Sequence, residues 1–169
     1  MKRVVVIGSG GAGKSTFARS LAEVTGLPLI HLDALYWQPG WQPTPRDVWR
    51  QRVEELVAQD EWIMDGNFQS TFDLRLPRAD TIFYLDYSRF LCLFRAIKRI
   101  WQWRGKTRSD MGPGCPEKVM DLQFARWIWN YPDAERPKVL KILKELDEGR
   151  EIFIHNSPQE TRAFLDGLN

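Results

Sequence analysis

The chain contains no long hydrophobic run and only two cysteines. Its first apolar run, residues 4–7, stops at a glycine-rich segment and is too short for the core of a signal peptide, and no stretch approaches the roughly 20 apolar residues that cross a bilayer. Cys92 and Cys115 have neither metal-ligand nor C-x-x-C spacing, which argues against a zinc site and a disulfide framework. These absences predict one globular domain, residues 1–169, in the reducing cytoplasm, with no membrane partner.

Acidic residues are missing from residues 88–108, although the net charge of the whole chain is only +2. The basic residues of this segment are Arg89, Arg95, Lys98, Arg99, Arg104, Lys106 and Arg108. The rest of the molecule is therefore net negative, and the positive charge is concentrated in one place. Such a segment favours a polyanionic ligand, either the phosphates of a nucleotide or a nucleic-acid backbone.

A glycine-rich stretch, "GSGGAGKS" at residues 8–15, matches the pattern G-x-x-x-x-G-K-[ST] in full. It follows a β-branched run and precedes a segment with apolar residues at helical spacing, so it lies at a predicted strand-to-helix turn. There the backbone N–H groups and the helix N-terminus attract phosphates. The predicted nucleotide-binding residues are Gly8, Ser9, Gly10, Gly11, Ala12, Gly13, Lys14, Ser15 and Thr16. Lys14 is expected to reach the β- and γ-phosphates and Ser15 to hold Mg²⁺; the alternative is a glycine turn without a nucleotide.

Five apolar strands are expected at residues 4–7, 27–32, 61–65, 81–86 and 151–155. Helices are expected from residue 14, over about 45–59 with Thr44 as N-cap, over 88–103, from Pro116 to about Asn130, from Asp133 after an interruption at Pro132, and from Pro158. The segment 36–45, with three prolines and a glycine, is expected to lack regular structure. Strands that alternate with helices predict an α/β fold with a five-stranded parallel sheet covered on both faces, in three layers.

Three of the predicted strands end at Asp33, Asp65 or His155. In parallel sheets the carboxyl ends of the strands meet at one edge, so these residues are expected beside the glycine-rich loop. Asp65 is a candidate Mg²⁺ ligand together with Ser15, and Asp33 is a second candidate. Asp33 is alternatively a base that accepts the proton of a substrate hydroxyl. For both aspartates the structural alternative is a cap of a strand-to-loop turn.

The basic segment is expected to form a helix and a lid, at about residues 101–118, that closes over phosphates. On the helix, Phe90, Phe94, Ile97 and Trp101 share a face that is predicted to pack, which leaves the arginines free. The candidate catalytic residues are Lys14, Asp33, Arg99, Arg104, Arg108 and Arg126. Tryptophans border both irregular segments; they are interpreted as core, with aromatic flaps for a planar or apolar acceptor as the alternative.

The motifs "GSGGAGKST", "IMDG" and "KRIWQWRGKTR" resemble those of P-loop kinases of the adenylate and shikimate kinase group. The segments "HLDALYWQPGW", "WIMDGNF", "LRLPRADTIFYLD" and "GCPEK" are similar to the adenylate-kinase-related family labelled topology modulation proteins. The resemblance implies a P-loop NTPase fold with a lid, ATP and Mg²⁺, a metal-water ligand at Asp65, an acceptor or metal contact at Asp33, and adenine contacts near Asn156.

The sequence departs from adenylate kinases after Asp65-Gly66, where the arginine that binds AMP is missing. Arg75 and Arg46 are the candidates to replace it. The favoured interpretation is a kinase that moves the γ-phosphoryl of ATP to a small acceptor, for example a nucleotide, held by the loop and helix at 33–59 and the lid. The alternative is a nucleotide-dependent protein that binds nucleic acid through the basic segment. The sequence does not identify the acceptor or the oligomeric state.

Overall fold

The computed structural model describes residues 1–117, 121–146 and 149–168. Along the chain its elements are β1 (Arg3–Gly8), α1 (Lys14–Thr25), β2 (Leu29–His31), α2 (Leu32–Tyr36), β3 (Trp37–Gln38), β4 (Gln42–Pro43), α3 (Arg46–Val57), β5 (Trp62–Asp65), η1 (Gln69–Thr71), α4 (Phe72–Arg78), β6 (Thr81–Leu85), α5 (Arg89–Trp103), α6 (Leu122–Ala134), α7 (Arg136–Glu145), β7 (Glu151–His155) and α8 (Pro158–Asp166). The predicted five-stranded parallel sheet is confirmed, with strand order β2-β5-β1-β6-β7.

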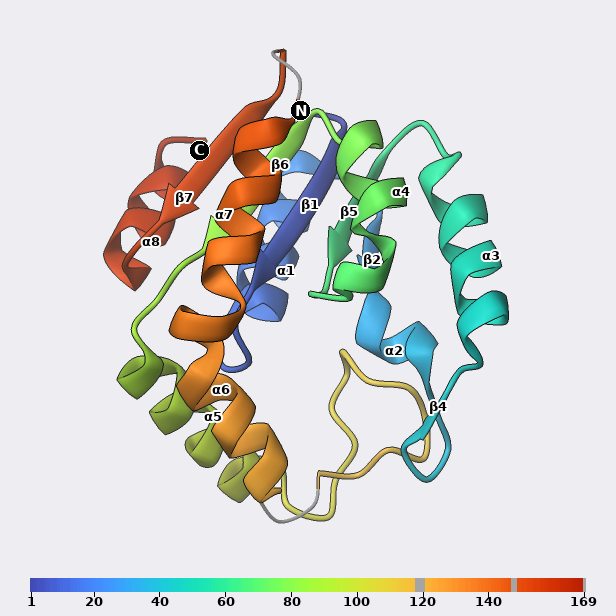
Figure 1. The fold of residues 1–169 in the computed structure, drawn as a ribbon, viewed down its shortest axis with the longest axis vertical. Coiled ribbons are helices and arrows are strands. Elements are labelled where there is room, and N and C mark those ends of the chain that lie inside the picture. Colours follow the sequence, from blue (N-terminus) through green and yellow to red (C-terminus); the bar gives the residue numbers. More distant parts are fainter. Residues whose placement is uncertain (118–120, 147–148, 169) are drawn as a thin grey trace.

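Two apolar cores, one on each face of the sheet, make the fold a three-layer structure. Alternate residues of β1 point to opposite faces, with Val5 and Ile7 in one core and Val4 and Val6 in the other. Side chains of α3, α4 and α7 complete the first core, and side chains of α1, α5 and α8 complete the second. In Figure 1, α4 and α7 lie in front of the sheet and α1 lies behind it. The central strands are buried on both sides, which explains their continuous apolar sequence.

Several predicted boundaries around the second strand are wrong. β2 ends at His31, and Asp33 lies in the first turn of the short helix α2 rather than at the strand end. The segment 36–45 is not irregular throughout, because Trp37 and Gln38 pair with Pro43 and Gln42 in a small antiparallel hairpin. Thr44 does not cap α3, since its hydroxyl donates to the Tyr36 carbonyl at 2.6 Å across that hairpin, and Pro45 occupies the N-cap position.

The helices of the second half also begin and end at other residues than expected. Pro116 lies outside any helix, and α6 begins at Leu122 with the Asp121 carboxylate accepting from the Gln123 amide; residues 118–120 of the predicted helix lie outside the described residues. Pro132 is inside α6 instead of interrupting it, and the chain changes direction at Glu135. Tyr131 is anchored in the larger core, which holds the last turn of α6 in place despite the proline.

The predicted packing face of the basic helix is wrong. Phe90, Phe94, Ile97 and Trp101 of α5 are exposed, each with more than half of its surface open to solvent. The buried side of α5 instead consists of small residues, Cys92 and Ala96. Small side chains let the helix approach the glycine-rich loop closely, so the bulky side chains point outward. No helix of the described residues is long and apolar enough to span a membrane.

Candidate functional site

The glycine-rich loop lies where predicted, between β1 and the N-terminus of α1. Gly13 precedes α1 in a left-handed conformation (φ 92°), and the first turn of the helix contains no acidic residue, so its positive end is not compensated. The Lys14 ammonium donates to the Ser9 carbonyl at 3.0 Å, which folds the lysine back across the loop. Within the described residues, the amides of Gly11 and Gly13 have no hydrogen-bond partner. Such free amides are suited to bind phosphate oxygens.

Helix α5 covers the loop from the side and supplies a second cation. The Arg95 guanidinium donates to the Ala12 carbonyl at 3.3 Å, and its Nη1 lies 3.4 Å from the place a Cβ on Gly13 would occupy. The loop thus has a cation on each of two carbonyls: Lys14 contacts that of Ser9, and Arg95 of α5 contacts that of Ala12. Both cations are placed to neutralise a polyphosphate.

Asp65, the last residue of β5, carries an unsatisfied carboxylate oxygen. Its Oδ2 lies 2.9 Å from His31 Nδ1, whereas Oδ1 is buried without a hydrogen-bond partner among the described residues. The two residues are paired in register in adjacent strands. An orphaned carboxylate oxygen at the strand end fits a Mg²⁺ site completed by Ser15, phosphates and water, since Mg²⁺ keeps several waters and needs few protein ligands. The described residues contain no cluster of three or more His, Cys, Asp or Glu that would form an all-protein metal cage.

Among the described residues, no side chain or amide hydrogen-bonds the Asp33 carboxylate, although charged side chains lie near it. Burial raises the pKa of the Asp33 carboxyl above its ordinary value of 3.8, and the Asp65 carboxylate raises it further, while Lys14 and Arg108 oppose the shift. A carboxylate with a raised pKa and free oxygens is suited to accept a proton or a hydrogen bond from a bound molecule.

The described part of the predicted lid, residues 104–117, is here called the lid segment, and it lies against the β3–β4 hairpin. The Trp41 indole N–H donates to the Pro116 carbonyl at 2.9 Å, and the Gly40 amide donates to the Gly114 carbonyl at 2.8 Å. Figure 1 shows the lid segment beside the hairpin at the lower end of the molecule. Lys118, the last residue of the predicted lid, lies outside the described residues.

Two arginines, Arg99 of α5 and Arg108 of the lid segment, are held by buried acids. Arg108 Nη1 donates to Asp110 Oδ2 at 2.7 Å, and Arg108 Nε lies 2.8 Å from Glu117 Oε1. Arg99 Nε reaches the same Glu117 oxygen at 3.2 Å. Burial lowers the pKa of Arg99, and the neighbouring Arg108 lowers it further, while Glu117 opposes both. Glu117 therefore ties α5 and the lid segment together at this end of the site.

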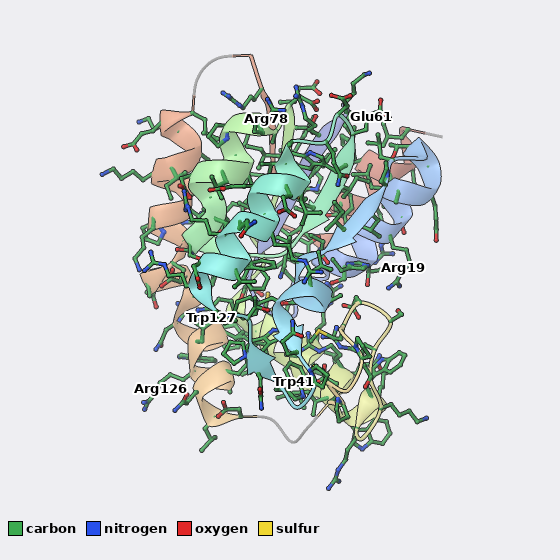
Figure 2. All side chains as sticks on the ribbon, turned by 90° about the vertical axis from the view of Figure 1, so that its right-hand side faces the viewer. Arg19, Trp41, Glu61, Arg78, Arg126 and Trp127 are labelled. Carbon is green, nitrogen blue, oxygen red and sulfur yellow. The ribbon has the colours of Figure 1, made fainter. Side chains whose placement is uncertain are left out.

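One cleft of about 1270 Å³ joins the glycine-rich loop, Asp33 and the lid segment, and most of the predicted site residues line it, whereas Asp65 is buried and outside its lining. The predicted residues in its lining are Gly10, Gly11, Ala12, Gly13, Lys14, Ser15, Thr16, Asp33, Arg99 and Arg108. Gly8 and Ser9 form the start of the loop beneath it. Arg104, Arg126 and Asn156 are exposed and not in the lining. Figure 2 shows Arg126 projecting outward from α6, whereas the neighbouring Trp127 points toward the interior.

Sequence analysis missed several residues of the site, namely His31, Arg95, Asp110 and Glu117 as individual candidates. His31 precedes Asp33 by two positions, and its partner Asp65 is distant in sequence, so only the strand register reveals the pair. Asp110 follows Arg108 by two positions, and this spacing is the local sequence feature that indicates an acid pairing with the basic segment. Arg75, a candidate to bind a phosphate, is instead fully buried and bonds backbone carbonyls.

The comparisons with known proteins support the architecture. No family model and no curated protein matches the chain. A shikimate kinase from Acinetobacter baumannii, solved in complex with shikimate, is similar over 99% of this chain and 90% of its own, with 17% identity and a TM-score of 0.58. A gluconokinase from Sinorhizobium meliloti 1021 is similar over 99% and 91%, with 19% identity and a TM-score of 0.54. A deoxyadenosine kinase from M. mycoides with bound dATP covers both chains fully, with 14% identity and a TM-score of 0.53.

At these identities the likeness establishes the fold alone, which this chain shares with these kinases. The more specific resemblance to the topology modulation family remains a prediction from the sequence motifs.

Proposed function

We propose that the protein is a kinase that transfers the γ-phosphoryl group of Mg-ATP to the hydroxyl of a small acceptor. The observation that carries the proposal is the unpartnered Asp33 carboxylate, which shares one cleft with the phosphate-binding loop and Lys14. A phosphate site alone fits any nucleotide-binding protein. A second polar group across the cleft, free to accept a proton, is what a phosphotransferase needs in addition.

In this proposal, each group of cleft residues has a separate role in phosphoryl transfer. The free amides of the loop and Lys14 bind the β- and γ-phosphates, and Ser15 and Asp65 hold Mg²⁺, which when bound neutralises charge on the transferring group. Arg95 adds positive charge beside the phosphates. Arg99 and Arg108, paired with Glu117, line the cleft next to the lid segment. Asp33 orients the acceptor hydroxyl and takes its proton. The lid segment and the β3–β4 hairpin exclude water from the cleft.

The alternative, a nucleic-acid-binding regulator, has less support. It requires a basic surface that is free to contact a phosphate backbone. Of the basic segment, Arg95 bonds the phosphate-binding loop, and Arg99 and Arg108 pair with Glu117 inside the cleft. These residues serve a nucleotide site more readily than an extended polymer.

The test is the rate of ADP formation from Mg-ATP with a panel of nucleosides, nucleoside monophosphates and small hydroxylated metabolites. One acceptor is expected to raise the rate, and Asp33→Asn is expected to lower that rate by about 10²–10⁴-fold while ATP still binds. The matched control is Asp60→Asn, an exposed carboxyl outside the cleft, which keeps the wild-type rate. Acceptor-dependent turnover that survives in Asp33→Asn refutes the role of Asp33, and a rate that no acceptor raises refutes the kinase.

A further inference from the structure

The part of the cleft that contains Asp33, Asp110 and Glu117, here called the far end, differs in charge from the end at the glycine-rich loop. Asp33, Asp110 and Glu117 contribute three carboxylates there, against the two guanidinium groups of Arg99 and Arg108. Both arginines are already in contact with carboxylates at 2.7–3.2 Å. The other cations of the lining are Lys14 and Arg95 at the glycine-rich loop, together with Arg19, Lys98 and Arg162. A phosphate beside Asp33 would therefore meet three carboxylates and two guanidinium groups that are already paired.

The arginines that a phosphorylated acceptor would use are engaged elsewhere. Arg75 is completely buried, and its guanidinium donates to the carbonyls of Gly66, Asn67 and Phe68 at 2.7–3.1 Å and to the Thr71 hydroxyl at 3.1 Å. Burial lowers the pKa of Arg75 to about 9, and the Asp65 carboxylate opposes this shift. Arg46 is exposed and does not line the cleft. Neither replaces the missing AMP-binding arginine.

The walls of the same end are aromatic. Trp37, Trp41, Phe68 and Asp33 all line the cleft. Trp127 of α6 also lines it, and stacks on Phe124, which lies beside Gly10 of the glycine-rich loop. The rings of Trp37 and Trp41 meet edge to face with centroids 5.6 Å apart. The side chains of the three tryptophans and Phe68 are each half-buried, so part of each ring is open to a ligand.

The backbone is strained where two of these rings are placed. Within the described residues, Trp41 (φ 65°) and Phe68 (φ 24°) are the non-glycine residues with positive φ. Bulky residues rarely adopt this conformation, and such strain concentrates at ligand sites. The Trp41 ring is fixed by its hydrogen bond to Pro116, so it is oriented before a ligand arrives.

We propose that the acceptor is an uncharged molecule with a planar ring and a free hydroxyl, that is, a nucleoside rather than a nucleoside monophosphate. This inference rests on the proposed kinase activity. The planar base lies against Trp41 and its aromatic neighbours, and the sugar hydroxyl faces Asp33. In the transfer, the hydroxyl oxygen bonds to the γ-phosphorus and the bond from that phosphorus to the bridging oxygen of ADP breaks. The hydroxyl proton passes to the Asp33 carboxylate, and the products are ADP and a nucleoside monophosphate.

The first experiment compares matched acceptors in the ADP-release assay: each common nucleoside, its 5′-monophosphate, and glucose as a non-planar polyol. We expect one nucleoside to give a kcat/KM at least about 100-fold above its monophosphate and above glucose. Arg99 and Arg108, which a second phosphate would need, are already paired with carboxylates, and glucose has no planar ring to lie against the aromatic side chains. A monophosphate or glucose as the better acceptor overturns the inference but leaves the kinase intact. If no acceptor stimulates ADP release, the proposed function itself fails, and the inference fails with it.

Two variants test the stated causes separately. Trp41→Ala is expected to raise the KM for the nucleoside by about 10-fold, the size of a lost stacking contact, whereas Trp41→Phe keeps the ring and stays near the wild-type KM. Glu117→Gln is expected to lower the inhibition constant of the nucleoside monophosphate by about 10-fold, because it releases the two guanidinium groups. Glu145→Gln, an exposed residue of α7, is the matched control. An unchanged KM in Trp41→Ala, or unchanged inhibition in Glu117→Gln, contradicts the assignment.

Discussion

The close approach of Gly11 to helix α5 predicts that this glycine is needed for packing, independently of any role in phosphate binding. A Cβ on Gly11 would lie 2.1 Å from the Cys92 carbonyl oxygen and 3.2 Å from the Ala96 amide nitrogen, both backbone atoms of α5. Gly11 also has a φ of 78°. Gly11→Ala therefore forces a left-handed alanine, which costs about 1–2 kcal/mol, and a displacement of α5, which costs about 1–3 kcal/mol.

The matched control is Gly26→Ala at the C-terminus of α1. Gly26 has a similar φ of 72°, and nothing lies within 4 Å of its added Cβ, so it carries the conformational cost without the clash. The loss of unfolded-state entropy on replacing glycine is common to both variants and cancels in their difference. The difference in free energy of unfolding is thus expected to be about 1–3 kcal/mol, which corresponds to about 2–12 °C in melting temperature for a chain of this size.

The assay is thermal and urea unfolding of the two variants without nucleotide, followed by titration with Mg-ATP. Without nucleotide, Gly11→Ala is expected to melt clearly below Gly26→Ala. An equal loss in the two variants would show that α5 does not depend on this glycine, and the packing argument would be refuted.

Three further predictions concern single side chains. Arg75→Met removes the donor of the Gly66 and Asn67 carbonyls, whereas the Phe68 carbonyl still accepts from Thr71. It is expected to lower the free energy of unfolding by about 2–5 kcal/mol in urea unfolding, without a direct effect on acceptor affinity. Asp33→Asn is expected to melt at a higher temperature than the wild type at pH 7. The pKa of the Asp33 carboxyl is raised from 3.8 in the folded protein, so the folded state favours the protonated form. The wild type therefore loses stability as the pH rises from 3.8 through the folded pKa. The advantage of Asp33→Asn should therefore shrink as the pH falls toward 4. Saturating Mg-ATP, at about 100 times its Kd, should stabilise the wild type by about 2.7 kcal/mol, and Lys14→Ala should remove most of this shift in a thermal-shift assay.

Local patterns predicted those parts of the fold that depend on neighbouring residues. The apolar strands and the turn before Lys14 follow from β-branched runs and glycine chemistry, and Ser157 caps α8 as its sequence suggests, accepting from the Glu160 amide at 3.2 Å. The position of Asp33 was not predictable in the same way, because β2 has only three residues and the chain turns into α2 at once. Likewise, the assignment of Arg75 to phosphate binding could not be excluded without knowing that its guanidinium lies under the 66–68 turn.

The exposed aromatic face of α5 shows why periodicity alone misjudged this helix. Hydrophobic spacing identifies an amphipathic helix, but it assumes that the bulkier apolar face is buried. Here α5 packs against α6 and against the glycine-rich loop, and on the loop side only small side chains allow the helix to approach backbone so closely. Cys92 and Ala96 therefore face the loop, and Phe94 and Trp101 face outward.

The same packing connects the glycine-rich loop to the lid segment. Gly11 fixes the distance between the phosphate-binding loop and α5, and α5 in turn carries Arg95 to the loop and Arg99 to Glu117 of the lid segment. A phosphate that draws the loop or Arg95 toward itself thus acts on the helix to which the lid segment is tied. Under the proposed function, the glycines of the loop therefore have two roles: their amides are free to bind phosphate, and their lack of side chains lets the cationic helix approach the same phosphate.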